Sequence, residues 1–299
     1  MAGSLRIPPD PPDPPAPHIP KEHPMGKLAK AFEKSDTPTA RLRPAGASRK
    51  PETVTPAITS LEELFEAEKW DPRLKISTDP NAGAFESFRR LRTPILYPSS
   101  GPKPRTILVT SVVPHEGKGF ICANLGVAIA RDVEHHALML DCDFRSPALA
   151  QLFGLSNETG LVDHLRDKVD LPLLIRKTGQ PKLSLIPSGR PPANPSEMLT
   201  SARMSRLIDE MAERYDDRVI LFDSPPNIVA SETGILAKHL DGVVLVVRHG
   251  GAKKEHVKRF VDAVGPEKIV GLVYNAYPET TLESYIEKKM GYGYGNYYK

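Results

Sequence analysis

The sequence of 299 residues has few of the features that mark secreted, metal-binding or membrane-spanning proteins. It contains two cysteines, Cys122 and Cys142, which lack metal-ligand spacing and which we expect to be reduced and buried. No apolar run approaches the ~18 residues that cross a bilayer, and the N-terminus lacks the charged-then-apolar pattern of a signal peptide. These absences favour a cytoplasmic protein that would meet a membrane only through a partner.

Aromatic residues are scarce, at 6% of the chain, and the net charge is only +3. No basic stretch has aromatic residues interleaved with it, so we expect no nucleic-acid partner. Hydrophobic residues make up 39% of the sequence, which is enough for one sizeable α/β domain.

Prolines are distributed unevenly along the chain. Residues 1–56 hold 13 of the 31 prolines and a single aromatic residue, Phe32, and such a segment cannot bury a core. We interpret it as a disordered extension. The expected organisation is a Pro-rich extension over 1–56, a helical linker over 57–80, a folded domain over 81–282 and a flexible tail over 283–299.

The linker contains an amphipathic pattern, SLEELFEAEKW, over Ser60–Trp70. It begins with Ser-x-x-Glu, the signature of a helix cap. We expect its apolar face, including Trp70, to pack on the folded domain.

The most informative segment is Ser111–Leu125, SVVPHEGKGFICANL. A buried-strand pattern, Thr106–Thr110, precedes it and a helical pattern follows, which is the setting of a phosphate-binding P-loop. Gly117 and Lys118 stand where loop amides and an ammonium hold phosphates. Gly119 occupies the position of the Ser or Thr whose hydroxyl binds Mg²⁺, so the motif is incomplete by itself.

Two more apolar runs end in carboxylates. Ala137–Pro147 (ALMLDCDFRSP) contains Asp141 and Asp143, and Val219–Pro226 (VILFDSPP) contains Asp223. Because ligands bind at the carboxyl ends of parallel strands, we expect these acids and Lys118 to meet at one site for ATP and Mg²⁺. The alternative for each Asp taken alone is a helix cap or a turn.

Apolar runs alternate with helical patterns through the rest of the sequence. This alternation predicts an α/β fold with a doubly wound, mostly parallel sheet of the P-loop NTPase type. The further strands expected are Leu183–Pro187, Gly242–Val247 and Ile269–Tyr274, and the helices are Ala84–Thr93, Met204–Glu213 and Lys254–Val264. Asn275 ends the last strand, where it would contact the adenine or close a turn.

Together these motifs resemble the bacterial tyrosine kinases of capsule and exopolysaccharide synthesis, in their cytoplasmic autokinase form. The resemblance covers roughly residues 68–299. The loop resembling the family's Walker A motif consists of Ser111, Pro114, His115, Glu116, Gly117, Lys118 and Gly119. The second Walker motif is present as Asp141, Asp143, Arg145 and Pro147, and Walker B as Asp223, Ser224, Pro225 and Pro226.

The resemblance implies a nucleotide site of defined composition. It implies catalytic roles for Lys118, Asp141, Asp143 and Asp223, of which the three acids would hold Mg²⁺. It implies ATP contacts from Pro114, His115, Glu116, Gly117, Lys118, Gly119, Phe120 and Arg145. One of the pair Asp141 and Asp143 would also accept the proton of the tyrosine hydroxyl.

The loop departs from the family pattern at two positions. His115 replaces a glycine, and we expect it to take the left-handed backbone conformation that His tolerates better than most residues. Gly119 removes a metal-binding hydroxyl, which we expect to cost about 1–3 kcal/mol in metal–nucleotide binding. That cost corresponds to one to two orders of magnitude in activity.

Glu86, Arg89 and Arg92 recur every three residues and share one helical face. Without the resemblance, these residues would be interpreted as a solvent-exposed helix face with a Glu–Arg ion pair that contributes little to stability. The family resemblance implies instead that the face meets the neighbouring subunit of a homo-oligomeric ring.

The chain ends in a cluster of tyrosines among glycines. The cluster consists of Tyr285, Tyr292, Tyr294, Tyr297 and Tyr298. The resemblance implies that these are autophosphorylation sites, reached by the active site of an adjacent subunit. The alternative is a Gly- and Tyr-rich end without a role.

Three functions therefore stand open. The first is an active tyrosine autokinase that controls polysaccharide synthesis or export, activated by an inner-membrane polysaccharide copolymerase as the family implies. The second is a catalytically weak relative that acts as a scaffold. The third is a partitioning-type P-loop ATPase, although such ATPases lack the Glu86 face and the tyrosine tail.

Overall fold

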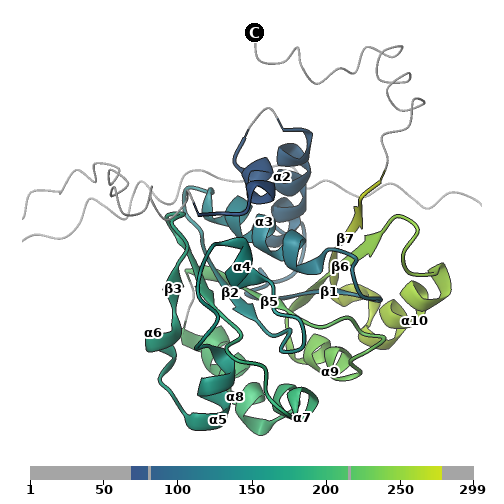
Figure 1. Ribbon diagram of the computed structural model, residues 1–299. Helices are drawn as coiled ribbons and strands as arrows, with labels where there is room; N and C mark the ends of the chain where they lie inside the picture. The colour runs from purple at the N-terminus through teal and green to yellow at the C-terminus, as the bar shows by residue number, and fades with distance from the viewer. Residues whose placement is uncertain (1–68, 80–81, 215–216, 278–299) are drawn as a thin grey trace, which may run out of the picture. The chain divides into compact units, whose positions relative to one another are not determined.

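The structure is a computed structural model that describes residues 69–79, 82–214 and 217–277. The Pro-rich extension, most of the Ser60–Trp70 pattern and the tyrosine tail lie outside these residues. Within them, seven strands form one sheet in the order β3-β4-β2-β5-β1-β6-β7 (Figure 1). The strands span Thr106–Ser111 (β1), His136–Asp141 (β2), Arg176–Lys177 (β3), Leu183–Ile186 (β4), Arg218–Asp223 (β5), Gly242–Arg248 (β6) and Ile269–Asn275 (β7).

Strand pairing is parallel throughout except between β3 and β4, which is antiparallel. The central strands read as continuous apolar runs because both faces of the sheet are covered. Every residue of β1 is buried, and so are the last five residues of β2 and of β5. The prediction of a doubly wound, mostly parallel sheet is confirmed.

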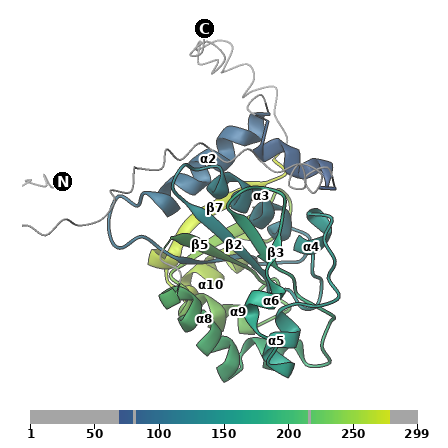
Figure 2. The same ribbon diagram turned by 90° about the vertical axis from the view of Figure 1, so that its left-hand side faces the viewer.

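Helices cover the sheet in two layers (Figures 1 and 2). One layer holds the 3-10 turn Pro72–Ser77 (η1) with helices α2 (Gly83–Leu96), α3 (Lys118–Ala130) and α4 (Leu149–Leu152). The opposite layer includes the helices α5 (Leu161–Asp167), α6 (Leu171–Leu174), α7 (Pro195–Leu199), α8 (Ala202–Arg214), α9 (Glu232–His239) and α10 (Lys254–Val264). A second 3-10 turn, η2 (Pro266–Lys268), precedes β7.

Helix α3 packs against the centre of the sheet and is almost wholly buried. Apolar and small residues surround its axis, in contrast to the amphipathic helices α8 and α10 at the surface. Its first residue is Lys118, so the helix places the start of the loop–helix junction directly over the strand ends.

Helix α2 is longer than the sequence predicts. A helix was expected over Ala84–Thr93, and Pro94, which lacks an N–H, lies inside the observed helix. The observed helix continues to Leu96 because Ile95 and Leu96 are buried against the neighbouring elements, and this packing outweighs the lost hydrogen bond.

Trp70 packs on the domain as expected. Its ring meets Phe153 edge-on with centroids 5.1 Å apart, and its indole N–H donates to the carbonyl of Thr178 at 2.6 Å. Cys122 and Cys142 are free and fully buried, and burial raises the pKa of both thiols well above the usual range.

Candidate nucleotide-binding site

The register of the strands brings the two carboxylate motifs to one edge of the sheet. Strands β2, β5 and β1 are neighbours, and Asp141 pairs with Asp223 across β2 and β5. A cavity of about 480 Å³ opens beside these strand ends. Its wall consists of Asp71, Arg73, Pro114, His115, Gly117, Lys118, Gly119, Phe120, Asp143, Arg145, Ser146, Ala148, Gln151, Leu152, Pro225, Pro226 and Val229.

Two residues of the loop adopt the left-handed backbone conformation. His115 has φ of 62° and Gly117 has φ of 93°, so His115 does take the conformation expected at a glycine position. Gly117 is fixed further by its neighbour, since an added Cβ would lie 2.3 Å from the side-chain nitrogen of Asn275. The loop can therefore accept His at position 115 but needs glycine at position 117.

Lys118 lies among the carboxylates. Its Nζ is 2.6 Å from Oδ2 of Asp143. Burial alone would lower the pKa of the Lys118 ammonium, but the charges of Asp223 and Asp143 raise it above its usual value. The side chain is therefore a cation positioned at the mouth of the phosphate loop.

The sequence left two interpretations of Asp141 open, a helix cap and a member of the nucleotide site, and its position agrees with both. Its Oδ2 accepts the N–H groups of Ala148 and Leu149, both at 3.0 Å, at the start of α4. Burial raises the pKa of Asp141 well above its usual range, and the neighbouring Asp223 adds to the effect. Asp141 thus caps a helix and also contributes charge to the site, but it does not line the cavity.

Asp223 is a buried carboxylate without hydrogen-bond partners among the described residues. It is fully buried, and neither of its oxygens has a hydrogen-bond partner in the structure. Burial raises its pKa to about 6, although the Lys118 ammonium acts in the opposite direction. Buried carboxylates in native proteins are normally paired, so these oxygens indicate a place for a cation or a donor that arrives with a ligand.

The carboxylates fit Mg²⁺ as a partner of a nucleotide. Hard oxygen donors suit this ion, which is commonly held by one or two carboxylates together with phosphates and waters. No group of three or more His, Cys, Asp or Glu within the described part of the chain has the arrangement of a self-sufficient metal cage. Metal binding by all three of Asp141, Asp143 and Asp223 remains a prediction.

Gly119 faces Asp223 directly. A Cβ at this position would lie 3.1 Å from Oδ2 of Asp223 and 3.2 Å from Cβ of Ala148. A Ser or Thr here would thus bring its hydroxyl group next to the unpartnered carboxylate. The space is tight, so Ala148 would have to move by a few tenths of an ångström to admit it.

Glu116 plays a part that the sequence did not reveal. Its buried carboxylate accepts four backbone N–H groups, from Val112 and Val113 at 3.0 Å each, from Ala252 at 3.1 Å and from Arg248 at 3.2 Å. Glu116 does not line the cavity, unlike the other residues expected to contact ATP. Its side chain instead connects the loop to the end of β6 and to the segment after it.

Asn275 completes this attachment. Its side-chain amide donates to the carbonyl of Glu116 at 2.8 Å, and its own side-chain oxygen accepts the N–H of Ala276 at 2.8 Å. Asn275 therefore supports the loop, and its contact with an adenine stays a prediction. The sequence pointed to Asn275 only through its place at the end of a predicted strand.

Arg145 is paired with an acid across the mouth of the cavity. Its guanidinium lies 3.2 Å from Oε1 of Glu232 and donates to the hydroxyl of Ser196 at 2.6 Å. Ser196 in turn donates to Glu232 at 2.7 Å. This triad joins the second Walker segment to α7 and α9, and neither partner of Arg145 was identified from the sequence.

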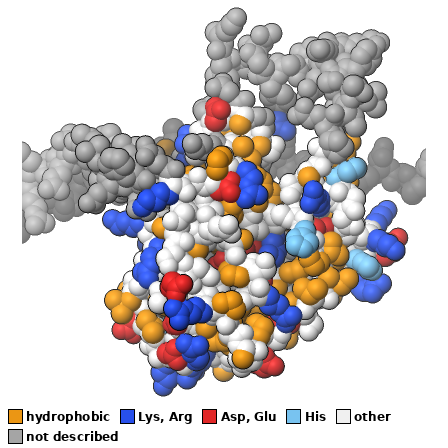
Figure 3. Space-filling view, viewed as in Figure 1, with side chains coloured by type: hydrophobic (Ala, Val, Ile, Leu, Met, Phe, Trp, Pro, Cys, Tyr) orange, Lys and Arg blue, Asp and Glu red, His pale blue; other side chains and the backbone are white. Residues whose placement is uncertain are grey.

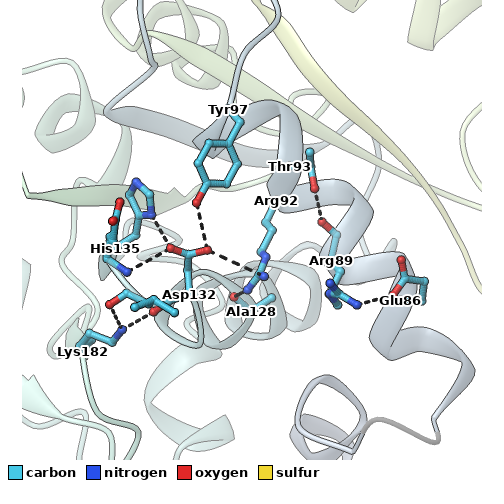
Figure 4. A network of polar contacts seen from close by, with 11 residues as sticks. Glu86, Arg89, Arg92, Thr93, Tyr97, Ala128, Asp132, His135 and Lys182 are labelled. Atoms are coloured by element: carbon cyan, nitrogen blue, oxygen red, sulfur yellow. Dashed lines mark hydrogen bonds and ion pairs between the residues drawn. The ribbon is translucent and has the colours of Figure 1, made fainter. Parts of the chain in front are cut away.

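The expected subunit-contact face is only partly free. Glu86 and Arg89 are exposed and pair with each other at 3.1 Å, whereas Arg92 turns towards the end of α3 (Figure 4). There it donates to the carbonyl of Ala128 and lies 3.9 Å from Asp132. Arg92 therefore holds α2 on α3, and the role of this face in assembly remains a prediction.

The fold and the site define a class. Nucleotide-binding proteins of the P-loop type share three features with this structure. They have a parallel doubly wound sheet, a lysine at the loop–helix junction, and carboxylates at adjoining strand ends.

Comparison with known proteins places the chain within this class. No family model matches the chain. It is 32% identical over 200 residues to the tyrosine-protein kinase YwqD of Bacillus subtilis, covering 66% of this chain and 83% of the relative. It is 33% identical over 171 residues to the tyrosine-protein kinase Wzc of Salmonella typhimurium, covering 57% of this chain but only 23% of the relative.

Two solved structures of tyrosine kinase domains are also similar to this chain. The kinase domain of Escherichia coli tyrosine kinase Etk matches with a TM-score of 0.62 and 27% identity over 71% of this chain and 84% of that domain. The BceF tyrosine kinase domain matches with a TM-score of 0.59 and 30% identity over 73% of this chain and 90% of that domain. The chain belongs to the bacterial tyrosine-protein kinase family.

The attachment by Glu116 leads to the first prediction. Glu116→Gln would place an amide NH₂ against backbone donors and leave buried N–H groups unsatisfied, which we expect to cost about 1–3 kcal/mol of stability. Hydrogen exchange should accelerate at the amides of Val112, Val113, Arg248 and Ala252. The matched control is Glu197→Gln at an exposed position. Unchanged protection at these four amides would contradict the role assigned to Glu116.

The second prediction concerns the raised pKa of Asp223. A carboxyl group that binds its proton more tightly when folded lowers stability as the pH rises from its ordinary pKa of 3.8 to about 6, and this loss is complete above that range. Asp223→Asn should therefore stabilise the nucleotide-free protein at pH 8 by about 1–3 kcal/mol, and the gain should vanish near pH 4. Denaturant unfolding in a metal chelator measures it, with the exposed Asp209→Asn as control.

Proposed function

We propose that this chain is an ATP-dependent protein-tyrosine autokinase. The single observation that carries the proposal is the arrangement at the strand ends, where the Lys118 ammonium lies 2.6 Å from Asp143 and beside the unpartnered carboxylate of Asp223. The relatives and the solved kinase domains support the same activity.

The residues of the site divide the work of phosphoryl transfer. The loop amides and Lys118 neutralise the charge of the β- and γ-phosphates as it shifts in the transition state. Bound Mg²⁺ supplies further neutralisation of the phosphate oxygens. Asp223 and Asp141 add the negative charge that retains the ion.

Asp143 is the better placed of the two candidate proton acceptors. Asp143 lines the cavity, whereas Asp141 does not. Both have protein partners: one oxygen of Asp141 accepts two backbone N–H groups, and Asp143 accepts the N–H of Ser146 and lies 2.6 Å from the Lys118 ammonium. A phenol with a pKa near ~10 needs such an acceptor at neutral pH. We therefore assign removal of the tyrosine hydroxyl proton to Asp143 within this proposal.

The substrate in this proposal is the tyrosine tail of an adjacent subunit. The tail lies outside the described residues, and three glycines lie among its last four tyrosines and before them. A ring assembled through the face of Glu86 and Arg89 would bring the tail to a neighbouring active site. Each phosphate adds about −1.5 to −2 charges, which would change how the tail binds and release subunits from the ring.

The cellular role follows from the family resemblance: control of capsular or exopolysaccharide synthesis or export, with an inner-membrane polysaccharide copolymerase as activator. Among the described residues, every helix is too short or too polar to cross a bilayer. In this proposal the kinase works in the cytoplasm, at the inner membrane, through that partner.

The third prediction tests the substrate. Deletion of Tyr292–Tyr298 should remove most of the phosphotyrosine that the purified protein gains with Mg·ATP, because four of the five clustered tyrosines are lost. Antibody detection of phosphotyrosine measures the effect. Lys118→Met is the control for activity and should abolish the signal altogether. An undiminished signal in the deletion variant would show that the acceptors lie elsewhere.

A second function has one observation in its favour. Gly119 supplies no hydroxyl, and a Cβ added at this position would lie only 3.2 Å from Cβ of Ala148. A catalytically weak kinase that serves as an assembly scaffold is therefore the second candidate. The similarity to YwqD, Wzc and the two solved kinase domains gives no support to a partitioning-type ATPase.

The fourth prediction separates these two candidates. Gly119→Ser should raise the affinity for Mg·ADP by about 5- to 100-fold, which is the equivalent of ~1–3 kcal/mol from one restored hydroxyl contact. Affinity for ADP in a metal chelator should stay the same, since the hydroxyl acts through the ion. Calorimetry measures both. Equal Mg·ADP affinity in the two proteins would mean that Gly119 does not impair the natural site.

A further inference from the structure

An exposed apolar surface adjoins the nucleotide cavity. Ile228, Val229 and Ile235 are 54%, 47% and 47% exposed and lie within eight consecutive residues, across the turn that leads from β5 into α9. Figure 3 shows hydrophobic side chains gathered in the part of this face above α9. We call these three residues the apolar shelf. Grouped exposed apolar side chains mark a binding surface more often than isolated ones do.

The shelf is attached to the phosphate loop. The N–H of Ile228 donates to the carbonyl of Val112 at 3.0 Å, and the N–H of Asn227 donates to the carbonyl of Ser111 at 2.9 Å. Val229 also lines the cavity together with Pro225 and Pro226. The shelf thus adjoins the cavity that Asp143 also lines, and two backbone hydrogen bonds fix it to the phosphate loop.

We propose that the apolar shelf binds the tyrosine tail of a second copy of this chain and positions its phenols for transfer. This inference rests on the proposed function and assigns the substrate-recognition surface of the same site. The last ten residues of the chain, MGYGYGNYYK, contain four tyrosines and one charged side chain, that of Lys299. Such an aromatic, nearly uncharged segment suits an apolar surface better than a charged one.

The spacing of the tyrosines suits a shelf beside an active site. Tyr292 and Tyr294 are separated by one glycine, so in an extended chain their Cα atoms lie about 7 Å apart on the same side. One ring can then pack on the shelf while the other enters the mouth of the cavity. Binding through neighbouring aromatic rings, rather than through one fixed sequence, would let several tyrosines of the tail serve in turn.

The test separates the enzyme from the acceptor. The acceptor is the full-length Lys118→Met variant, which keeps its tail. The enzyme is the full-length chain with Tyr285, Tyr292, Tyr294, Tyr297 and Tyr298 changed to Phe. Into this enzyme we would introduce Ile228→Asp with Ile235→Asp, which leaves Val229 and the cavity wall intact. The matched control is Leu173→Asp on α6, which is 67% exposed and is not part of the shelf.

The shelf variant should raise the KM for the acceptor by about tenfold or more, because charged side chains remove the apolar contact. Its kcat and its affinity for Mg·ADP should stay within about twofold of the unsubstituted enzyme. Leu173→Asp should change neither constant. An unchanged KM in the shelf variant, or an equal rise in the control, would overturn the inference while leaving the kinase function intact.

A second measurement does not require activity. Fluorescence anisotropy with a labelled peptide of residues 290–299 should show binding to the Tyr→Phe protein and at least about fivefold weaker binding to its shelf variant. If no phosphotyrosine forms in any protein, the proposed function fails and the peptide still decides the shelf. If the shelf variant instead loses self-association while peptide binding is retained, the occupant is the folded body of another copy and our inference is wrong.

Discussion

Three carboxylates concentrated at the ends of the neighbouring strands β2 and β5 are the constraint on which the rest of the site depends. Asp141 and Asp223 are fully buried, Asp143 nearly so, and the ammonium of Lys118 lies among them. The sheet enforces this arrangement because the register of β2 with β5 sets Asp141 opposite Asp223. Charge in a protein interior is costly, so the Lys118 ammonium offsets part of it, and burial raises the pKa of both Asp141 and Asp223. In the proposed function, a magnesium–nucleotide complex would add a further cation, together with phosphates for the loop and Lys118 to bind.

Holding a phosphate loop above such a site requires support from outside the loop. His115 occupies a left-handed position that glycine would fill without strain, so the loop sequence does not by itself ensure this conformation. The carboxylate of Glu116 replaces that local preference with four backbone hydrogen bonds, one of them from the last residue of β6 and one from the segment that follows it. Asn275 adds a further bond from the end of β7. The conformation of the loop is therefore determined largely by its surroundings.

The sequence predicts the parts of this protein that depend on local pattern. Buried parallel strands are recognisable as apolar runs, and carboxylates that follow them must meet at one edge, so Asp141, Asp143 and Asp223 were identified before any geometry was known. Other contacts depend on residues that are distant in the sequence. They are the hydrogen bonds of the buried Glu116 carboxylate, the ion pair of Arg145 with Glu232 and the hydrogen bond from Arg92 to Ala128. A residue type at a motif position does not disclose which of its neighbours its side chain will contact.

Two hydrogen bonds connect the phosphate loop to the apolar shelf on one side and to the segment before the tyrosine tail on the other. On one side, Val112 accepts a hydrogen bond from Ile228 and so carries the apolar shelf. On the other side, Glu116 is bonded to Asn275, two residues before the last described residue, beyond which the tyrosine tail continues. Phosphates that order the loop would thus also order the surface where a tail arrives and the point from which a tail departs. In a ring, nucleotide binding in one subunit would prepare it both to accept a neighbour's tail and to offer its own.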